Sequence, residues 1–267
     1  DFSEGICYNN KKYKGEKSMP KRTVEEWSWE NPRAQDSFLE YVGFDDEQKS
    51  AEQVVKIEKL LGLSPCKGLD VGCGNGRQTT VFARRGYSMT GIDVSESFLR
   101  AAKERAQKEN FAIDYRLMRA SELTEQGVYD FALAFHHSIG FLPEKELPVH
   151  FSKICQSLKP GGKFLFEMAG PKLTTKPWEN IRNWTESENK FVLVEKKLEN
   201  GYRLETCIEI EKESGNITEL REKQRAFSLA EIQTLLFEAG FRLVCSYCDL
   251  EKTPANADRF GVFICCR

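Results

Sequence analysis

The stretch LDVGCGNGRQTT at residues 69–80 joins an apolar run, a carboxylate and closely spaced glycines. The apolar residues before the glycines predict a short buried strand, and GRQTTVFARRG at residues 76–86 predicts a helix. Gly72, Gly74 and Gly76 lie between the two, where they permit a tight turn and a close approach of the backbone to a ligand. The stretch therefore predicts the first strand, loop and helix of an open α/β sheet, in which ligands bind outside the carboxyl ends of the strands.

Strands and helices alternate on both sides of this stretch. Residues 45–63 carry apolar side chains at helical spacing, and Ser95 is the predicted N-cap of a helix over residues 95–110. Near-continuous apolar runs are typical of parallel strands that helices cover on both faces. The predicted strands are residues 66–73, which include the strand before the glycines, and residues 87–95, 111–118, 129–135, 163–169, 241–250 and 260–266. The remaining predicted helices are residues 143–162 and 228–240.

A different pattern begins at about residue 171. Leu204, Thr206, Ile208 and Ile210 alternate with charged residues, and Asn200-Gly201 and residues 214–216 have turn composition. The pattern predicts an antiparallel meander whose apolar face packs on the rest of the protein and whose charged face meets water. The predicted fold class is therefore α/β: a doubly wound, mostly parallel seven-stranded sheet with helices on both faces, plus an antiparallel β meander inserted after strand five.

The composition restricts the class of protein. Lys plus Arg number 39 and Asp plus Glu 41 among the 267 residues, a net charge of −2, which argues against a surface that coats nucleic acid. The first residues are polar and no apolar run approaches the roughly 20 residues of a membrane span, so we expect neither a signal peptide nor a membrane anchor. Nine cysteines, an odd number spread through apolar runs, indicate reduced thiols in the cytoplasm. Cys245 and Cys248 have the spacing of a metal-binding pair, but no second pair joins them, so no metal site is predicted.

Two carboxylates near the glycine loop indicate the kind of ligand. The G-x-G-x-G spacing differs from that of dinucleotide binders, and no lysine follows it as in a phosphate loop. Asp70 would repel a phosphate but suits an ammonium or sulfonium charge. Asp93 ends the second strand, about 20 residues beyond the glycines, where an acid accepts hydrogen bonds from both ribose hydroxyls. The pair predicts a nucleoside-type ligand that carries a positive charge.

The same segments resemble a known family. LDVGCGNGRQT at residues 69–79, GIDVS at 91–95 and LKPGGKFLFE at 158–167 look like class I S-adenosylmethionine-dependent methyltransferases. The aromatic-rich lead-in, the tail FSLAEIQTLLFEAGF and HHSIGFL at residues 136–142 resemble the subset that acts on small molecules. The resemblance implies an enzyme that transfers a methyl group from S-adenosylmethionine, leaving S-adenosylhomocysteine, to N or O of a small-molecule acceptor.

The resemblance also assigns the cofactor contacts. Asp70 and the backbone of the glycine loop face the methionine end, Asp93 takes the ribose, and Val94 packs near the adenine. The family usually has an Asp after strand three that receives the adenine amino group, but this chain has Arg119, whose guanidinium has no acceptor. We expect Ala120 backbone groups or the Ser121 hydroxyl to take over, with Arg119 stacking or pointing away. The predicted cofactor-binding residues are Asp70, Gly72, Cys73, Gly74, Asp93, Val94, Arg119, Ala120, Ser121 and Phe135.

The chain has three histidines, and two of them are adjacent just after strand four, beside the expected methyl group. Histidine titrates near neutrality, so His136 or His137 could remove a proton from the acceptor. We predict a catalytic role for this pair and favour His137, which lies further from the strand. The alternative is that both only line the pocket or bond to backbone in a turn. His150, inside a predicted helix, is interpreted as structural. Trp27, Trp29 and Tyr41 either line the pocket or pack the lead-in on the domain.

The predicted organisation has four parts. Residues 1–45 are an N-terminal lead-in with a partly mobile tail, and residues 46–170 are the cofactor-binding core. Residues 171–227 are an antiparallel insert over the acceptor site, and residues 228–267 are a C-terminal helix and strands that complete the core sheet. A monomer or a homodimer is expected.

Two other functions stay open. An RNA base or nucleotide methyltransferase would need a basic channel with stacking aromatics. A non-catalytic cofactor-binding subunit would have a blocked pocket and an exposed apolar patch.

Overall fold

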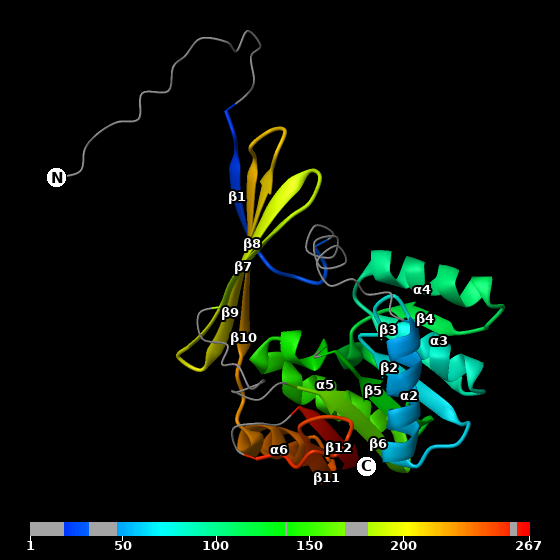
Figure 1. The fold of residues 1–267 in the computed structure, drawn as a ribbon. Coiled ribbons are helices and arrows are strands. Elements are labelled where there is room, and N and C mark those ends of the chain that lie inside the picture. Colours follow the sequence, from blue (N-terminus) through cyan, green and yellow to red (C-terminus); the bar gives the residue numbers. More distant parts are fainter. Residues whose placement is uncertain (1–18, 32–46, 137, 169–180, 257–260) are drawn as a thin grey trace, which may run out of the picture.

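The computed structural model describes residues 19–31, 47–136, 138–168, 181–256 and 261–267, and Figure 1 shows their arrangement. These residues form two sheets, one of seven strands and one of five. The five-stranded sheet stands beside the α/β core in Figure 1, and its strand β10 leads directly into helix α6 of the core. The helices are α2 (Glu47–Leu61), α3 (Arg77–Arg84), α4 (Glu96–Lys108), α5 (Leu147–Ser157) and α6 (Leu229–Glu238), with 3₁₀ turns η1 (Ala120–Glu122), η2 (Ser138–Phe141) and η3 (Glu144–Glu146).

The seven-stranded sheet has the strand order β11-β12-β6-β5-β2-β3-β4. Neighbouring strands from β4 to β6 run parallel, while β12 is antiparallel to both β6 and β11. This arrangement confirms the predicted doubly wound, mostly parallel sheet. The strands are β2 (Lys67–Val71), β3 (Ser88–Asp93), β4 (Asp114–Leu117), β5 (Tyr129–Ala134), β6 (Leu158–Glu167), β11 (Arg242–Tyr247) and β12 (Val262–Cys266).

Helices cover both faces of this sheet. Alternate residues of β5 belong to different clusters: Ala132 packs in the cluster that holds Phe151 of α5, whereas Phe131 packs in the cluster that holds Ile57 of α2 and Phe82 of α3. A strand buried on both sides needs apolar residues at every position, which explains the continuous run in β5. The predicted N-cap is confirmed, since the Ser95 hydroxyl accepts a hydrogen bond from the amide of Phe98.

One boundary differs from the prediction. The segment KPGG at residues 159–162 was expected to end the helix, but the structure ends α5 at Ser157 and begins β6 at Leu158. The register between β5 and β6 shifts here, from Tyr129 opposite Leu158 to Phe131 opposite Lys163. The proline and glycines therefore form an irregularity inside the strand, where they interrupt pairing instead of preceding it.

The second sheet has the order β1-β10-β9-β8-β7 and confirms the predicted meander. Its strands are β1 (Arg22–Glu26), β7 (Ile181–Glu186), β8 (Lys190–Glu199), β9 (Tyr202–Glu211) and β10 (Ile217–Arg225). Asn200 and Gly201 have φ values of 50° and 76°, as a tight hairpin turn requires. Strand β1 comes from the predicted lead-in and pairs in parallel with β10, a pairing that the sequence pattern did not predict.

The prediction of which face of the meander meets water is wrong. Arg203 and Cys207 lie on the face expected to be exposed, yet both are buried. The opposite face leaves Leu193 of β8 and Trp184 of β7 40% and 66% exposed. The register of the strands gives the reason. Cys207 is opposite Leu220 of β10, so Glu222, two residues further along β10, lies on the same face as Arg203 and Cys207. Glu222 lines the cavity described below, so this face borders the cavity. A sheet face that borders a polar cavity carries charged side chains, as a face exposed to water does, so composition alone does not distinguish the two.

Two further observations concern the described residues as a whole. No helix among them is long and apolar enough to cross a membrane. Every cysteine within the described ranges is a free thiol, and Cys7 lies outside them.

Candidate active site

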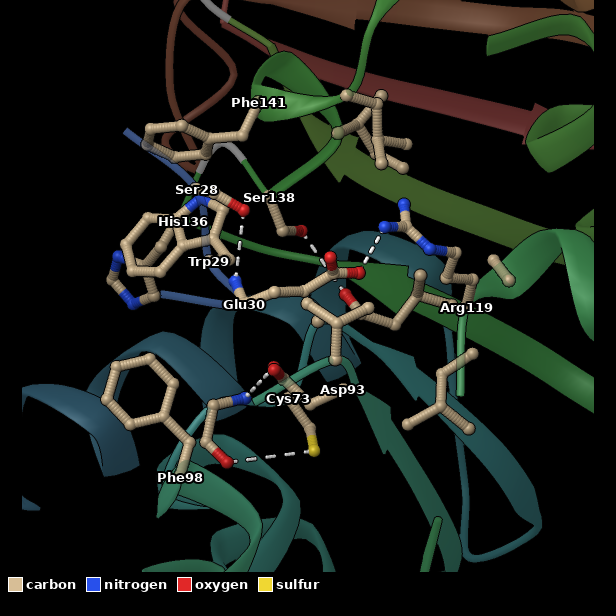
Figure 2. A pocket seen from close by; sticks show the side chains of 18 of the residues that line it. Ser28, Trp29, Glu30, Cys73, Asp93, Phe98, Arg119, His136, Ser138 and Phe141 are labelled. Atoms are coloured by element: carbon tan, nitrogen blue, oxygen red, sulfur yellow. Dashed lines mark hydrogen bonds and ion pairs between the residues drawn. The ribbon is translucent and has the colours of Figure 1, made fainter. Parts of the chain in front are cut away.

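A cavity of about 390 Å³ lies between the carboxyl ends of the core strands and one end of the second sheet. Three parts of the chain form most of its wall: the loops after β2 to β5, the segment Glu26–Glu30 at the end of β1, and Arg221–Gln224 of β10. Side chains of α3, α4 and α5 complete the wall. Figure 2 shows residues of the first two parts facing one another across it. The volume is in the range of pockets for small molecules and cofactors.

The glycine loop and Asp93 form one unit of this wall. The Gly74 amide donates to Asp93 Oδ2 and the Ser95 amide to Oδ1, both at 2.8 Å. These bonds fix the carboxylate, while each oxygen keeps a lone pair for a further donor such as a hydroxyl. Gly74 has a φ of 54° and no neighbouring atom within 4 Å of the place where a Cβ would stand. The loop therefore leaves open space beside the backbone, as a ligand that contacts the backbone requires.

Asp70 is the second buried carboxylate of the site. Asp70 is the last residue but one of β2, and the Thr79 hydroxyl donates to its Oδ2 at 2.5 Å. Burial, with a smaller contribution from the charge of Asp93, raises the pKa of Asp70 to about 6, although the Thr79 hydrogen bond opposes the shift. Burial likewise raises the pKa of Asp93. Two desolvated carboxylates in one cavity favour a ligand with positive charge, because such a ligand stabilises their ionised forms.

The residues present fit S-adenosylmethionine. Asp70 can oppose its positive charge, Asp93 can accept from its ribose, and Val94 and Met118 offer apolar contacts for a flat base. The predicted cofactor residues that line the cavity are Asp70, Gly72, Cys73, Gly74, Asp93, Val94, Arg119, Ala120 and Phe135. Ser121 is not among the lining residues.

Arg119 is held by two carboxylates. Its Nη2 donates to Glu30 after β1, as Figure 2 shows, and its Nη1 lies 3.5 Å from Glu146. The Arg119 amide donates to Glu122 at 2.6 Å, which caps η1. The guanidinium therefore links the lead-in to the core across the cavity wall.

His136 sits in an unusual backbone conformation at the end of β5. Its φ is 52°, and its amide donates to Glu167 Oε2 at 2.8 Å. The ring Nε2 lies 2.5 Å from Arg77 Nη2 and 2.7 Å from Gln78 Nε2. Both of those groups are donors, so Nε2 acts as an acceptor and the ring is neutral, with its proton on Nδ1. This geometry engages the lone pair that a general base would use. His137 lies outside the described residues.

Aromatic rings cover one side of the cavity. Trp29 lies between Phe141 and Phe98 in Figure 2, with ring centroids 4.9 and 6.1 Å apart. Trp27 meets Trp29 edge to face at 5.5 Å. Trp27 and Trp29 thus line the pocket, one of the two predicted possibilities, and Tyr41 lies outside the described residues.

Sequence reasoning missed several lining residues. Glu222 and Gln224 lie on the face of the meander that was expected to meet water, and the segment REKQR is polar at every position, so no alternation in it could have singled them out. His150, interpreted as structural, lines the cavity with Glu146 one helical turn before it. Within the described ranges, no three His, Cys, Asp or Glu side chains gather as a metal site would need.

Comparisons with known proteins agree with this geometry. Residues 69–162 match the methyltransferase domain family. The ubiquinone biosynthesis O-methyltransferase of Acinetobacter baumannii is 38% identical over 113 residues, which are 41% of this chain and 46% of that protein. A solved S-adenosylmethionine-dependent methyltransferase from Clostridium acetobutylicum has a TM-score of 0.70 at 14% identity, over 88% of this chain and 98% of that one. The solved structure of the sugar N-methyltransferase KedS8 from Streptoalloteichus has a TM-score of 0.66 at 17% identity, over 87% of this chain and 92% of that one.

The two kinds of likeness cover different parts. The chain spans less than half the length of the curated relative described above. The structural likeness extends over most of the chain, and at these identities it shows the fold.

Proposed function

The chain contains a class I S-adenosylmethionine-dependent methyltransferase domain, and on this premise we propose that it transfers the methyl group to a nitrogen atom of a small-molecule amine. The relatives include both an O-methyltransferase and a sugar N-methyltransferase, so the choice of nitrogen rests on this chain's own cavity.

Glu222 is the observation that carries the proposal. Glu222, on strand β10, lines the same cavity as Asp70 and Asp93. Burial raises the pKa of Glu222 to about 7, and the charge of Glu205 on β9 contributes, while a hydrogen bond from Gln224 opposes the shift. A carboxylate that titrates near neutrality can pair with an ammonium group and accept its proton. A hydroxyl acceptor would be activated less by this carboxylate, because the proton of a hydroxyl group is much harder to remove than that of an ammonium group.

The roles of the residues follow from their positions. When bound, S-adenosylmethionine supplies a methyl group activated by its sulfonium. Asp93 orients the ribose and Asp70 opposes the positive charge, which holds the ligand in one position. Trp29 and Phe141 exclude water from the cavity. Glu222 binds the acceptor ammonium and takes a proton from it, leaving the neutral amine as the nucleophile. The neutral ring of His136, held by Arg77 and Gln78, shapes the wall.

The test measures transfer of labelled methyl groups to a panel of amino sugars and to matched sugars with a hydroxyl in place of the amine. We expect label on the amines, with a rate that rises as pH passes through about 7, where Glu222 ionises. Glu222→Gln should lower kcat about a hundredfold, the scale for a lost general base, and remove that pH dependence. Affinity for S-adenosylhomocysteine should be retained.

Glu209→Gln is the matched control, because Glu209 lies on the same face of the second sheet but does not line the cavity. It should keep the kcat and pH profile of the wild type. Label on the hydroxyl sugars alone, or an unchanged pH profile in Glu222→Gln, would contradict the choice of nitrogen. Binding of S-adenosylhomocysteine by the variant shows that a loss of kcat is not a loss of fold.

A further inference from the structure

His150 is a buried imidazole whose nitrogen atoms have no hydrogen-bond partner among the described residues. Its side chain is 2% exposed, and it lines the cavity from helix α5. The nearest charged atom is Glu146 Oε2, 3.8 Å from Nε2, which is too far for a hydrogen bond. A buried polar group without a partner destabilises the fold, so a polar ring is not what packing alone would favour at this position.

The place of His150 in the cavity points to one part of the ligand. Helix α5 packs against η1, which follows β4, and Met118, Ala120 and His150 all line the cavity. Glu146 lies 3.5 Å from Arg119, just before η1, and 3.8 Å from His150, which brings the ring close to the end of β4. Asp93, which would bind the ribose, is the last residue of β3. A base attached to that ribose would therefore extend along the sheet edge toward the end of the neighbouring strand β4. His150 therefore borders the space for the base.

The chemistry of the ring fits the edge of adenine. Burial lowers the pKa of His150, with Arg119 contributing, while Glu146 and Glu122 act in the opposite direction. The Glu146 carboxylate 3.8 Å from Nε2 favours the tautomer with its proton on Nε2, which leaves Nδ1 as an acceptor. The amino group of adenine is an N–H donor that suits this acceptor, whereas an oxo group at the same position is itself an acceptor. Arg119 next to it has only donors, and these are engaged by Glu30 and Glu146.

We propose that His150 recognises the amino edge of the adenine ring and makes the site selective for adenine over its 6-oxo counterpart. This inference rests on the proposed use of S-adenosylmethionine. Of the two expected contacts to adenine, it takes the place of the Ser121 hydroxyl, because Ser121 does not line the cavity, and it leaves open the contact from Ala120 backbone groups.

The experiment compares two ligands by calorimetry: S-adenosylhomocysteine and S-inosylhomocysteine, in which an oxo group replaces the amine. The wild type should bind the first at least about tenfold more tightly, as expected when a buried polar pair is mismatched. His150→Leu should weaken S-adenosylhomocysteine about tenfold and reduce the preference to about twofold or less. His150→Gln keeps a donor and an acceptor, and should retain most of the preference.

Two controls separate this contact from general damage. Ser121→Ala should match the wild type for both ligands. Asp93→Ala should weaken both ligands by the same factor, because it removes a contact to the ribose that they share. A His150→Leu variant that keeps the full preference for adenine would overturn the inference and leave the proposed function intact. A wild type that binds neither ligand would overturn both.

Discussion

Asp70 illustrates, at the scale of single residues, how the site opposes the stability of the fold. Its pKa is raised to about 6, mainly by burial, so the folded protein binds this proton more tightly than the unfolded chain does. A raised carboxyl pKa means that stability is lost as pH rises from about 4 through about 6, and the loss is complete at neutral pH. The shift of about two units corresponds to at most about 3 kcal/mol.

We therefore expect Asp70→Asn to raise the free energy of unfolding at pH 8 by up to about 3 kcal/mol, while it weakens the binding of S-adenosylmethionine. The amide keeps an acceptor for the Thr79 hydroxyl, so packing is preserved. Urea unfolding at pH 8 and pH 4 measures the effect, and the two proteins should have nearly equal stability at pH 4. A variant that is less stable than the wild type at pH 8 would contradict the argument.

The same scale shows what the sequence could specify about the site. Asp70, Gly72, Gly74 and Asp93 line one cavity, because the ends of parallel strands meet at one sheet edge, while their contacts to the cofactor stay a prediction. The role of His136 was harder to foresee. Its ring is engaged by Arg77 and Gln78 of α3, and no pattern in the sequence gives that distance. A catalytic role for His137 stays a prediction.

Among the elements, β1 connects the lead-in to the active site. Its five residues, RTVEE, are mostly exposed, so they have none of the alternation that predicts a strand. The strand exists because β10 offers it a partner, and the Trp27 amide extends the pairing by donating to the Arg221 carbonyl at 2.6 Å. Pairing between distant segments is decided by the tertiary fold, which also explains why the meander was predicted from its turns but β1 was not.

Breaking β1 should loosen the aromatic wall more than the fold. We expect Val24→Pro to raise the Kd for S-adenosylhomocysteine about tenfold, because Trp29 and Glu30 lose the anchor that positions them. The melting temperature should change little, since β1 is an edge strand. Calorimetry and thermal unfolding together check this. Val24→Thr, which keeps both the amide and the strand propensity, should bind like the wild type, and equal Kd values for the two variants would contradict the role of β1.

On the scale of the whole molecule, buried acids set the response to pH. Burial raises the pKa of Glu167 and of Glu222 to about 7, and that of Asp70 to about 6. Each of these groups stabilises the fold less as pH rises through its folded pKa. His150 acts in the opposite direction, because burial lowers its pKa. Ion-paired acids such as Asp130 and Glu219, whose pKa values are lowered, lose their contribution only in more acidic solution.

We therefore expect the melting temperature of the ligand-free protein to be highest near about pH 5 and to fall as the pH rises from about 5 to about 7, where the last of the three acids has ionised. Differential scanning calorimetry across this range provides the measurement. Glu222→Gln should flatten the fall, because one of the three groups no longer titrates. A melting temperature that rises steadily to pH 8 would show that the ion pairs outweigh the buried acids.

The parallel pairing of β1 with β10 also has a consequence for biosynthesis. Lys21 and Asn216, joined by a hydrogen bond at the start of this pairing, are 195 positions apart in the chain. A ribosome releases Trp29 and Glu30 early, but their anchor appears only when residues 217–225 have left the exit tunnel. The nascent chain can complete β2 to β6 before then. It cannot assemble the aromatic side of the cavity, so the cofactor can stabilise the protein fully only near the end of translation.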